Sequence, residues 1–501
     1  MNELQEFDRY MAHLSEGLGH ADRHAGLRGY CTGLMSPLQR KSVEPMAAHI
    51  DPMKVRSRHQ SLHHFVADSD WSQEQMLLRV CQWVVPKMDF ADGGWWIIDD
   101  TGFPKQGRHS VGVARQYCGM LGKQDNCQVA VSVSLACEAA SVPVAWQLYL
   151  PHEWAEEAPR CQKAGVPEQL QFATKPQIAL RQIEHLMSQG APRHCVLADA
   201  GYGTDTAFRE RLSELGLRYA VGVTGSVTVW PPGREPLPPA AYGGRGIVPT
   251  RLRLGGKAQP QHQPQSIKEL ALELGPEHWH TVTWREGTNA KLSSRFARLR
   301  VRSAHRDSLR DQLRAPEWLL IEWPRGDAEP LKYWLSTLPQ DMALKRMVFE
   351  TKMRWRIERD YQDLKQDLGL GHFEGRGWRG FHHHAALSIA AYGFLLAQRL
   401  QHPDEVGGKK NSAQRQAPAL PTHYKPRGSP AHAAPRPILE ACNAWGGQVL
   451  GVVRSFFYPR LHQGAAGAGR ARSRRRQCSR RHDDESRASP DLRNAPSRGL
   501  A

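Results

Sequence analysis

The sequence predicts an α/β protein with a mixed sheet at its core, and three observations lead to this class. Residues 1–85 carry apolar side chains at spacings of three and four, which is typical of amphipathic helices. From residue 95 the chain has runs rich in Val, Ile and Trp, which indicate β-strands. After residue 170 helical and strand patterns alternate, and this order is typical of an α/β core.

Length and composition bound the kind of protein. The 501 residues are 40% hydrophobic, enough for a large core and two or three domains. The sequence has no run of 18 or more apolar residues, and its first residues are polar and amphipathic, so we expect a cytoplasmic protein without a membrane segment. The nine cysteines are scattered without a Cys-x-x-Cys pair, which predicts reduced thiols rather than disulfides or a thiolate zinc site.

The positive charge is concentrated in the last fifth of the chain. Residues 401–501 hold 18 Lys and Arg against 7 Asp and Glu, so +11 of the net charge of +17 lies there. This excess predicts a polyanionic partner such as DNA. The composition of this tail, first rich in Pro and Ala and then rich in Arg, predicts disorder. The sequence leaves open whether the tail binds DNA or has no function.

Residues 1–90 are expected to form a helical module that binds DNA. The stretches LQEFDRYMAHL and SQEQMLLRVCQWVV have helical periodicity, and KVRSRHQSLHHF between them is rich in Arg and His. A basic helix face suits contact with a DNA backbone, although a charged face is more commonly just solvated.

Residues 91–218 are expected to form the first part of the core. The runs WWIIDD, VGVARQYCG, NCQVAVSVSLACE and VPVAWQLYLP predict successive strands of an antiparallel meander. A helix that Gly190 ends should follow, then a short strand that ends at Asp199, then a helix capped by Thr204.

Residues 219–340 predict a β-rich insertion, because short apolar runs alternate there with Pro/Gly-rich turns. Its basic strand SSRFARLRVRSAHR is either a DNA contact or an exposed face. Residues 341–400 return to helix: one long amphipathic helix stopped by Gly369 and Gly371, then a helix that is apolar on nearly all sides and so buried. The triplet His382–His384 lacks metal-ligand spacing, which favours packing or capping over zinc binding.

Carboxylates occur at three places where a site could form. Asp99 and Asp100 end the first core strand, Asp199 ends a later strand, and Glu358 lies on the long helix. Hard divalent ions such as Mg²⁺ prefer oxygen ligands, and carboxylates that converge on such ions are typical of metal-assisted phosphoryl transfer. A buried acid at the edge of the sheet would be tolerated if metal and phosphate compensate its charge.

Two cations accompany Glu358 along the helix. Arg354 precedes it by four residues and Lys365 follows it by seven, so all three share one helical face. Taken alone, such a face is more commonly a surface salt-bridge ladder.

Three blocks of sequence resemble the catalytic blocks of DDE-superfamily insertion-sequence transposases. These blocks are IIDDTGFPKQGRHSVGVARQYCG, VLADAGYG and RWRIERDYQDLKQDLGLGHFEGRGWRGFHHHAAL. The resemblance covers roughly residues 5–400 and fades in the tail. It implies a ribonuclease H-like catalytic core with a β-rich insertion before the final Glu.

The resemblance assigns roles to the acids. It implies that Asp99, Asp199 and Glu358 are the catalytic residues and bind the metal. Asp99 is preferred over Asp100 because related transposases read Asp-x-Thr, with the catalytic Asp two residues before the Thr. Asp100 stays as the alternative.

The same family carries a Tyr-x2-Arg-x3-Glu-x6-Lys signature around its last acid. Arg354 and Lys365 match it and are expected to bind DNA phosphates, whereas Thr351 stands at the Tyr position and puts a phosphate contact there in doubt. Lys105, just past the first strand, is a further candidate for phosphate binding. Trp355 either stacks on a displaced base or, as is commoner for a helix Trp, belongs to the core.

The function that the resemblance implies is DNA cleavage at the ends of a mobile element and strand transfer into target DNA. Mg²⁺ is the expected cofactor, as two ions, with Mn²⁺ as a substitute. The expected partners are double-stranded DNA and further copies of the chain, as a homodimer or higher oligomer on DNA, in the bacterial nucleoid. Alternatives are a ribonuclease H-like nuclease without strand transfer and a catalytically inactive DNA-binding descendant. A glycosidase with two carboxylates is disfavoured by the basic composition.

Overall fold

The computed structural model describes residues 3–286 and 291–402, so the predicted disordered tail lies outside the described residues. The N-terminal part is helical, as the periodicity predicts. Its described helices are α1 (Glu3–Ser15), α2 (Asp22–Met35), α3 (Val43–Ile50), α4 (Val55–Ala67) and α5 (Gln73–Val84), followed by the 3₁₀ turn η1 (Val85–Lys87).

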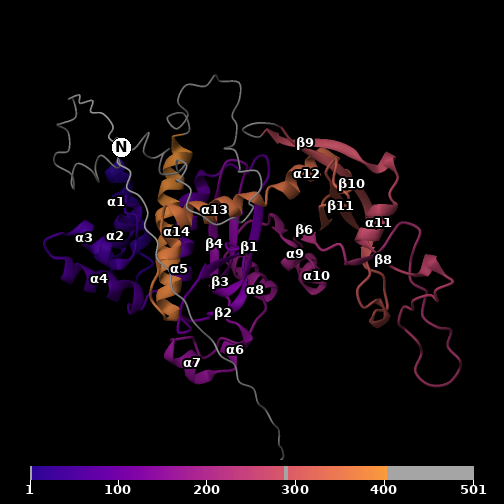
Figure 1. Ribbon diagram of the computed structural model, residues 1–501, viewed down its shortest axis with the longest axis horizontal. Helices are drawn as coiled ribbons and strands as arrows, with labels where there is room; N and C mark the ends of the chain where they lie inside the picture. The colour runs from indigo at the N-terminus through magenta and orange to yellow at the C-terminus, as the bar shows by residue number, and fades with distance from the viewer. Residues whose placement is uncertain (1–2, 287–290, 403–501) are drawn as a thin grey trace, which may run out of the picture. The chain divides into compact units, whose positions relative to one another are not determined.

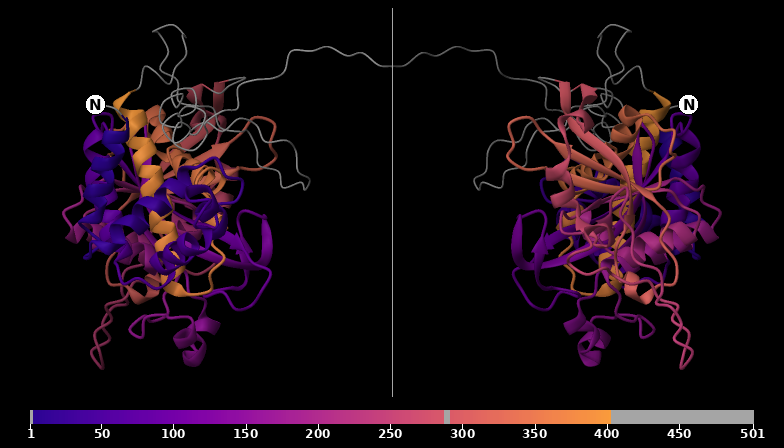
Figure 2. Two further views of the ribbon diagram at one scale, coloured as in Figure 1. Left: turned by 90° about the vertical axis from the view of Figure 1, so that its left-hand side faces the viewer. Right: turned by 90° about the vertical axis from the view of Figure 1, so that its right-hand side faces the viewer.

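The predicted buried helix is α14 (Trp378–Gln401), and its residues from Gly380 to Gln398 are all buried. It contacts α2, α4 and α5 on one side and strand β4 (Ser141–Leu148) on another, so it joins the N-terminal helices to the sheet (Figures 1 and 2). The Tyr10 hydroxyl of α1 donates to the Ala390 carbonyl at 2.8 Å. Among the described helices, α14 included, none is long and apolar enough to cross a membrane.

The predicted α/β class with a mixed sheet is confirmed, but the strand order differs from a simple meander. β1 (Trp95–Pro104) pairs antiparallel with β3 (Lys123–Ala136) and not with the next strand, β2 (Ala114–Cys118). β3 also pairs with β2 and β4. The 14 residues of β3 are long enough for β2 and β4 to pair with different parts of the strand, while β1 pairs with it as well. The last ten of these residues are buried. β5 (Cys195–Ala198) and β6 (Tyr219–Val223) continue the sheet in parallel with β1.

The sequence predicted that the first strand ends at its two acids, and this prediction is wrong. β1 continues to Pro104 because its residues from Asp100 onward keep their register with β3, where Asp100 faces Val131. Thr101 and Phe103 are buried along this extension. On its other edge β1 pairs with β5 only as far as Ile97, so beyond that point this edge has no described strand beside it.

Short helices connect the core strands: α6 (His152–Ala155), α7 (Ala158–Lys163), α8 (Lys175–Ser188), α9 (Ala200–Gly203) and α10 (Thr206–Glu214). α8 begins with a capping box, in which Thr174 and Gln177 exchange side-chain and backbone hydrogen bonds, and ends just before Gly190, whose φ is +79°. The predicted cap Thr204 is wrong. Asp205 caps α10 instead, because its carboxylate accepts two backbone N–H bonds at 2.9 and 3.3 Å.

The region after β6 adds further strands to the same sheet. Its elements are β7 (Thr228–Trp230), η2 (Pro260–His262), β8 (Gln265–Ser266), α11 (Ile267–Glu273), η3 (Pro276–His278), β9 (His280–Glu286), β10 (Lys291–Ser303), η4 (Asp307–Leu309), β11 (Glu317–Trp323) and β12 (Lys332–Ser336). The described strands follow the order β2-β3-β1-β5-β6-β12-β11-β10-β7-β8, with β4 beside β3 and β9 beside β10. The β-rich region is thus joined to the core through the β6–β12 pair.

The predicted long helix is two helices, α12 (Leu344–Lys352) and α13 (Trp355–Gln366). At the junction, hydrogen bonds span three residues instead of four: Met353 N–H donates to Glu350, and Ile357 N–H donates to Arg354. This 3₁₀-type tightening separates the two helices. Gly369, at φ +66°, stops the helical region as predicted, and the 3₁₀ turn η5 (Leu370–His372) follows.

A buried ion pair fastens α12 to the β-rich region. The Lys352 ammonium donates to Glu322 of β11 at 2.7 Å, and these side chains are 18% and 4% exposed. The same ammonium lies 4.4 Å from the ring centroid of Trp284 and 5.3 Å from that of Trp334. The pair therefore holds the end of α12, next to the junction with α13, against the sheet.

Replacing Lys352 by Met should destabilise the protein by about 3 kcal/mol, because it leaves the Glu322 charge buried without a partner. Urea unfolding of wild type and Lys352→Met measures the difference. The control is Lys268→Met, whose ion pair with Glu329 is 44% and 61% exposed, and which should destabilise the protein far less. Equal losses in the two variants would contradict this account.

Candidate active site

Two of the predicted acids lie level on neighbouring parallel strands. The last parallel pair joins Ile97 of β1 to Leu197 of β5, and each acid, Asp99 or Asp199, follows two residues later. Because β5 ends at Ala198, both carboxylates stand at the point where the gap between the strands opens. The Asp199 side chain caps α9 by accepting the Gly201 N–H at 2.9 Å.

Asp99 and Asp100 point in different directions, as successive residues of a strand do. Asp99 Oδ2 accepts a hydrogen bond from Arg354 Nη1 at 2.8 Å, whereas Asp100 Oδ2 accepts one from Lys175 Nζ at 2.8 Å. The sequence reasoning missed Lys175. A signal existed, because Lys175 stands in the first turn of α8, where the helix dipole disfavours a cation unless an acid such as Asp100 compensates it.

Arg354 joins the acid of the strand to the acid of the helix. Its Nη2 donates to Glu358 Oε1 at 2.6 Å, while its Nη1 binds Asp99. The side chains of Asp99, Arg354 and Glu358 are 15%, 24% and 54% exposed. Burial alone would lower the pKa of Arg354, but Asp99, Glu358 and Asp199 together raise it above its usual value. One guanidinium is therefore the shared counter-ion of all three predicted acids.

The site keeps an excess of negative charge in spite of Arg354. Burial raises the pKa of Asp99 to about 7; the Arg354 charge opposes this rise, and Asp199 and Asp100 add to it. Carboxylates that raise one another's pKa are typical of positions where an added cation would be stabilised.

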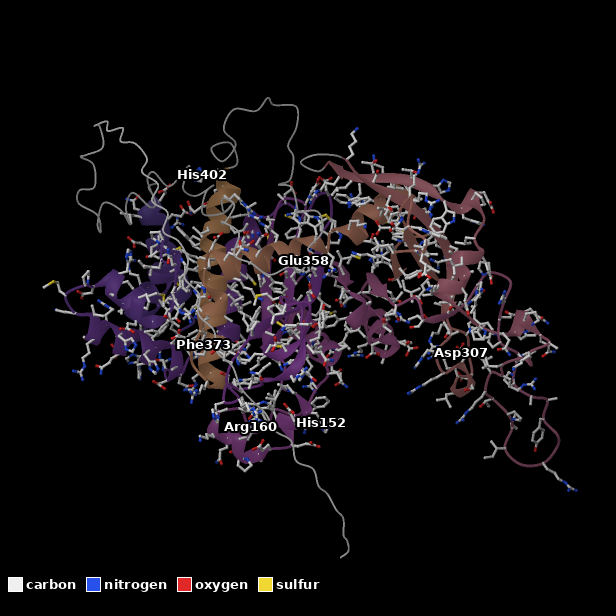
Figure 3. All side chains as sticks on the ribbon, viewed as in Figure 1. His152, Arg160, Asp307, Glu358, Phe373 and His402 are labelled. Carbon is white, nitrogen blue, oxygen red and sulfur yellow. The ribbon has the colours of Figure 1, made fainter. Side chains whose placement is uncertain are left out.

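The two predicted lysines bind backbone carbonyls. Lys365 Nζ donates to the Gly102 carbonyl of β1 at 2.8 Å and lies 4.8 Å from the Phe103 ring, and burial lowers its pKa to about 8. Lys105 Nζ instead donates to the Phe373 carbonyl at 2.9 Å. Lys365 therefore lies between α13 and β1, which contact each other, whereas the Lys105 ammonium binds at Phe373, which Figure 3 shows apart from Glu358.

Thr351 and Trp355 differ from what their positions suggested. Thr351 is buried, and its hydroxyl donates to the Val348 carbonyl at 2.9 Å, so it is not directed at a ligand. Trp355, the first residue of α13, is only half-buried. Its ring lies between two guanidinium carbons, 4.6 Å from that of Arg285 and 4.9 Å from that of Arg356. Sequence reasoning also missed Arg285, because no local pattern links β9 to α13.

Within residues 3–286 and 291–402, no three His, Cys, Asp or Glu side chains stand close enough together to hold a metal ion. The cation between Asp99 and Glu358 in this geometry is the Arg354 guanidinium. The seven described cysteines are free thiols.

The His triplet of α14 serves packing, as the sequence favoured. His384 can donate from Nε2 to the Gly369 carbonyl and accept at Nδ1 from the Tyr30 hydroxyl, both at 2.9 Å. His382 accepts the Leu148 N–H at Nε2 and contacts the Trp378 carbonyl through Nδ1. Each ring is therefore satisfied in its neutral form, and burial lowers the pKa of both to about 4.

Comparison with known proteins identifies relatives of the chain. Residues 13–291 match the family model described as DDE superfamily endonuclease, a range that includes Asp99 and Asp199 and ends before Glu358. A probable transposase for insertion sequence element IS701 from Microchaete diplosiphon is 32% identical over 192 residues. That alignment covers 38% of this chain and 46% of the relative, so the chain spans about half the length of the protein it matches.

Acid should destabilise the protein through the buried histidines. The pKa of His382 and of His384 is about 4 in the folded protein and 6.5 ordinarily. The neutral rings therefore stabilise the folded protein fully above pH 6.5, and this stabilisation is lost as the pH falls from 6.5 toward 4. Between pH 7.5 and 5.5 each should cost about 1 kcal/mol of unfolding free energy. Thermal unfolding should show a smaller loss over this range for His384→Gln, whereas the exposed control His63→Gln should follow wild type. Identical pH dependence in all three proteins would contradict this assignment.

Proposed function

The chain belongs to the DDE superfamily of endonucleases, and we propose that it is a transposase that cleaves DNA at the ends of its element and joins them to target DNA. The observation that carries this proposal is the gathering of three acids around one cation. Asp99 comes from β1, Asp199 follows β5, and Glu358 comes from α13, and all three act on Arg354. Acids from segments so far apart in sequence are typical of a catalytic site rather than of a surface ladder.

The sheet supports a ribonuclease H-like core. The strands β4-β3-β1-β5-β6 lie side by side; β3 is antiparallel to its neighbours β1 and β4, and β5 and β6 run parallel to β1. We propose that these strands, with α8, α13 and α14, form the catalytic core, and that β7 to β12 form the insertion before the last acid. The proposed domain limits are residues 1–90, 91–218, 219–340, 341–400 and 401–501.

The ligand chemistry of the three acids suits a hard divalent cation, although the acids do not stand close enough together to hold one in the described geometry. Asp99, Asp199 and Glu358 offer only oxygen ligands, and burial, followed by the charges of Asp199 and Asp100, raises the pKa of Asp99, so that a bound cation would stabilise its carboxylate. We therefore propose that these acids hold Mg²⁺, or Mn²⁺ in its place, as two ions. Such ions would activate the attacking water or 3′-hydroxyl and stabilise the leaving oxygen. The alternating directions of Asp99 and Asp100 support Asp99 as the ligand.

Arg354 would then have two alternative partners. In the described geometry it neutralises Asp99 and Glu358, which occupies the carboxylate oxygens that a metal would need. A guanidinium also binds phosphate in a bidentate manner. We propose that Arg354 leaves the acids for a DNA phosphate when substrate and metal bind, so that its charge stays compensated throughout. Lys365 would stabilise the same strand of DNA as a point charge from the far end of α13.

The basic surfaces proposed to bind DNA outside the site are α4 and β10. On α4, Arg56 and His63 are exposed and Arg58 is half-buried. On β10, Arg298 and Arg300 stack on Trp318, with guanidinium carbons 4.7 and 4.9 Å from its ring. A homodimer or higher oligomer on DNA is proposed because two element ends must be joined.

Cleavage of a supercoiled plasmid that carries the element's ends tests the proposal. Wild type should cut at the ends with Mg²⁺ but not with EDTA, and Asp99→Asn, Asp199→Asn and Glu358→Gln should not cut detectably, because each loses a ligand charge. The matched control is Asp100→Asn, which removes the neighbouring acid that faces Lys175 and should keep most of the activity.

Each other outcome points elsewhere. Cutting that persists in the three variants would refute the assigned acids. If Asp100→Asn abolishes cutting while Asp99→Asn retains it, the catalytic aspartate is Asp100 and not Asp99. Cutting without joined products would favour a nuclease without strand transfer, and end binding without cutting would favour an inactive DNA-binding descendant.

A further inference from the structure

An arginine of the β-rich region lies next to the proposed active site. Arg285 is the penultimate residue of β9, an edge strand that pairs with β10 and contacts α12. Its guanidinium carbon stands 4.6 Å from the ring centroid of Trp355. Trp355 directly follows Arg354, which binds Asp99 and Glu358. The chain fold therefore brings a cation from β9 to the first turn of α13, one residue from the counter-ion of the acids.

The guanidinium of Arg285 is unpaired. Its three nitrogens are shielded from water, and none has a hydrogen-bond partner among the described residues. Of the described arginines, it is the one whose three nitrogens are all buried in this way. Burial lowers the pKa of Arg285, which agrees with a charge that no acid compensates. Among the described residues, this guanidinium contacts the Trp355 ring in a cation–π stack.

The chemistry of this arrangement selects its ligand. A buried guanidinium without acceptors is unfavourable, and a ligand that offers oxygen acceptors in one plane would relieve this. Phosphodiester groups provide two such oxygens and a negative charge. The Trp355 ring lies against the guanidinium, so the stack itself uses none of the N–H groups that a phosphate would bind. No carboxylate among the described residues accepts from Arg285, and Glu358, on the same helix as Trp355, binds Arg354 instead.

We propose that Arg285, held by Trp355, binds a phosphate of the DNA strand next to the scissile one. This inference rests on the proposed function and adds to it a phosphate-binding residue supplied by the β-rich region. Because the three nitrogens are shielded in the described geometry, phosphate binding requires the atoms that cover them to move, while the stack on Trp355 is kept. The site would then be completed by three elements, with acids from the core, Arg354 from the helix junction and Arg285 from β9.

The test is DNA binding rather than cleavage. Fluorescence anisotropy of a duplex that carries the terminal sequence of the element is measured without divalent ions over a series of KCl concentrations. Arg285→Gln should bind about tenfold more weakly, and the slope of log affinity against log salt should fall by about 0.9, the value for one lost phosphate contact.

The matched control is Arg346→Gln, which removes the same charge from another arginine stacked on an aromatic ring. Arg346 lies 5.0 Å from the Phe349 ring, but it is already paired with Glu350 at 2.7 Å. Its salt slope should equal that of wild type. Thermal unfolding of both variants checks that they are folded.

A duplex series with single uncharged methylphosphonates around the cleavage position locates the contact. At one position of the series, the methylphosphonate should weaken DNA binding by wild type but not by Arg285→Gln. Arg285→Lys keeps a charge beside Trp355, so the same methylphosphonate should weaken its binding too. If Arg285→Gln does not fold, the Arg285→Lys scan decides, and a lack of any sensitive position in it overturns the inference.

The outcomes separate this inference from the proposed function. A wild-type chain that binds no DNA refutes both. A wild-type chain that binds, with an unchanged slope and an unchanged methylphosphonate pattern in Arg285→Gln, overturns the role of Arg285 alone and leaves Arg285 a structural partner of Trp355.

Discussion

The double ion pair of Arg354 is the interaction on which the site depends. It joins β1 to α13 through Asp99 and Glu358, and Asp199 adds to its stabilisation. The backbone hydrogen bonds tighten immediately before α13, and Arg354 lies within this tightened turn. The junction between α12 and α13 is therefore part of the site and not a mere interruption.

Three residues of this junction reach different parts of the protein. Lys352 binds Glu322 of β11, Arg354 binds the acids, and Trp355 stacks on Arg285 of β9. The β-rich region and the acids are thus held by side chains that lie within four positions of one another. A change in the position of β9 or β11 would be transmitted to the acids through a short, well-packed segment.

Local patterns in the sequence predicted the N-terminal helices, the buried helix α14 and the strands around the acids, because burial and periodicity decide these elements. The resemblance supplied the family, which the comparisons confirm. What the sequence could not give depends on pairing across long distances. The pairing of β1 with β3 extends β1 beyond Asp99, and the break before α13 accompanies a contact with a strand 255 residues away in sequence. Lys175 and Arg285 were missed for the same reason, since their partners are fixed only by the tertiary fold.

Binding of Mn²⁺ to the metal-free protein, followed by the electron paramagnetic resonance of the free ion, tests the central claim most directly. If Arg354 holds the place of the metal between Asp99 and Glu358, Arg354→Gln should bind Mn²⁺ more tightly than wild type in the absence of DNA. Asp99→Asn should bind it more weakly, and Lys365→Gln, whose partner is the Gly102 carbonyl, should resemble wild type. Equal or weaker Mn²⁺ binding by Arg354→Gln would contradict the account.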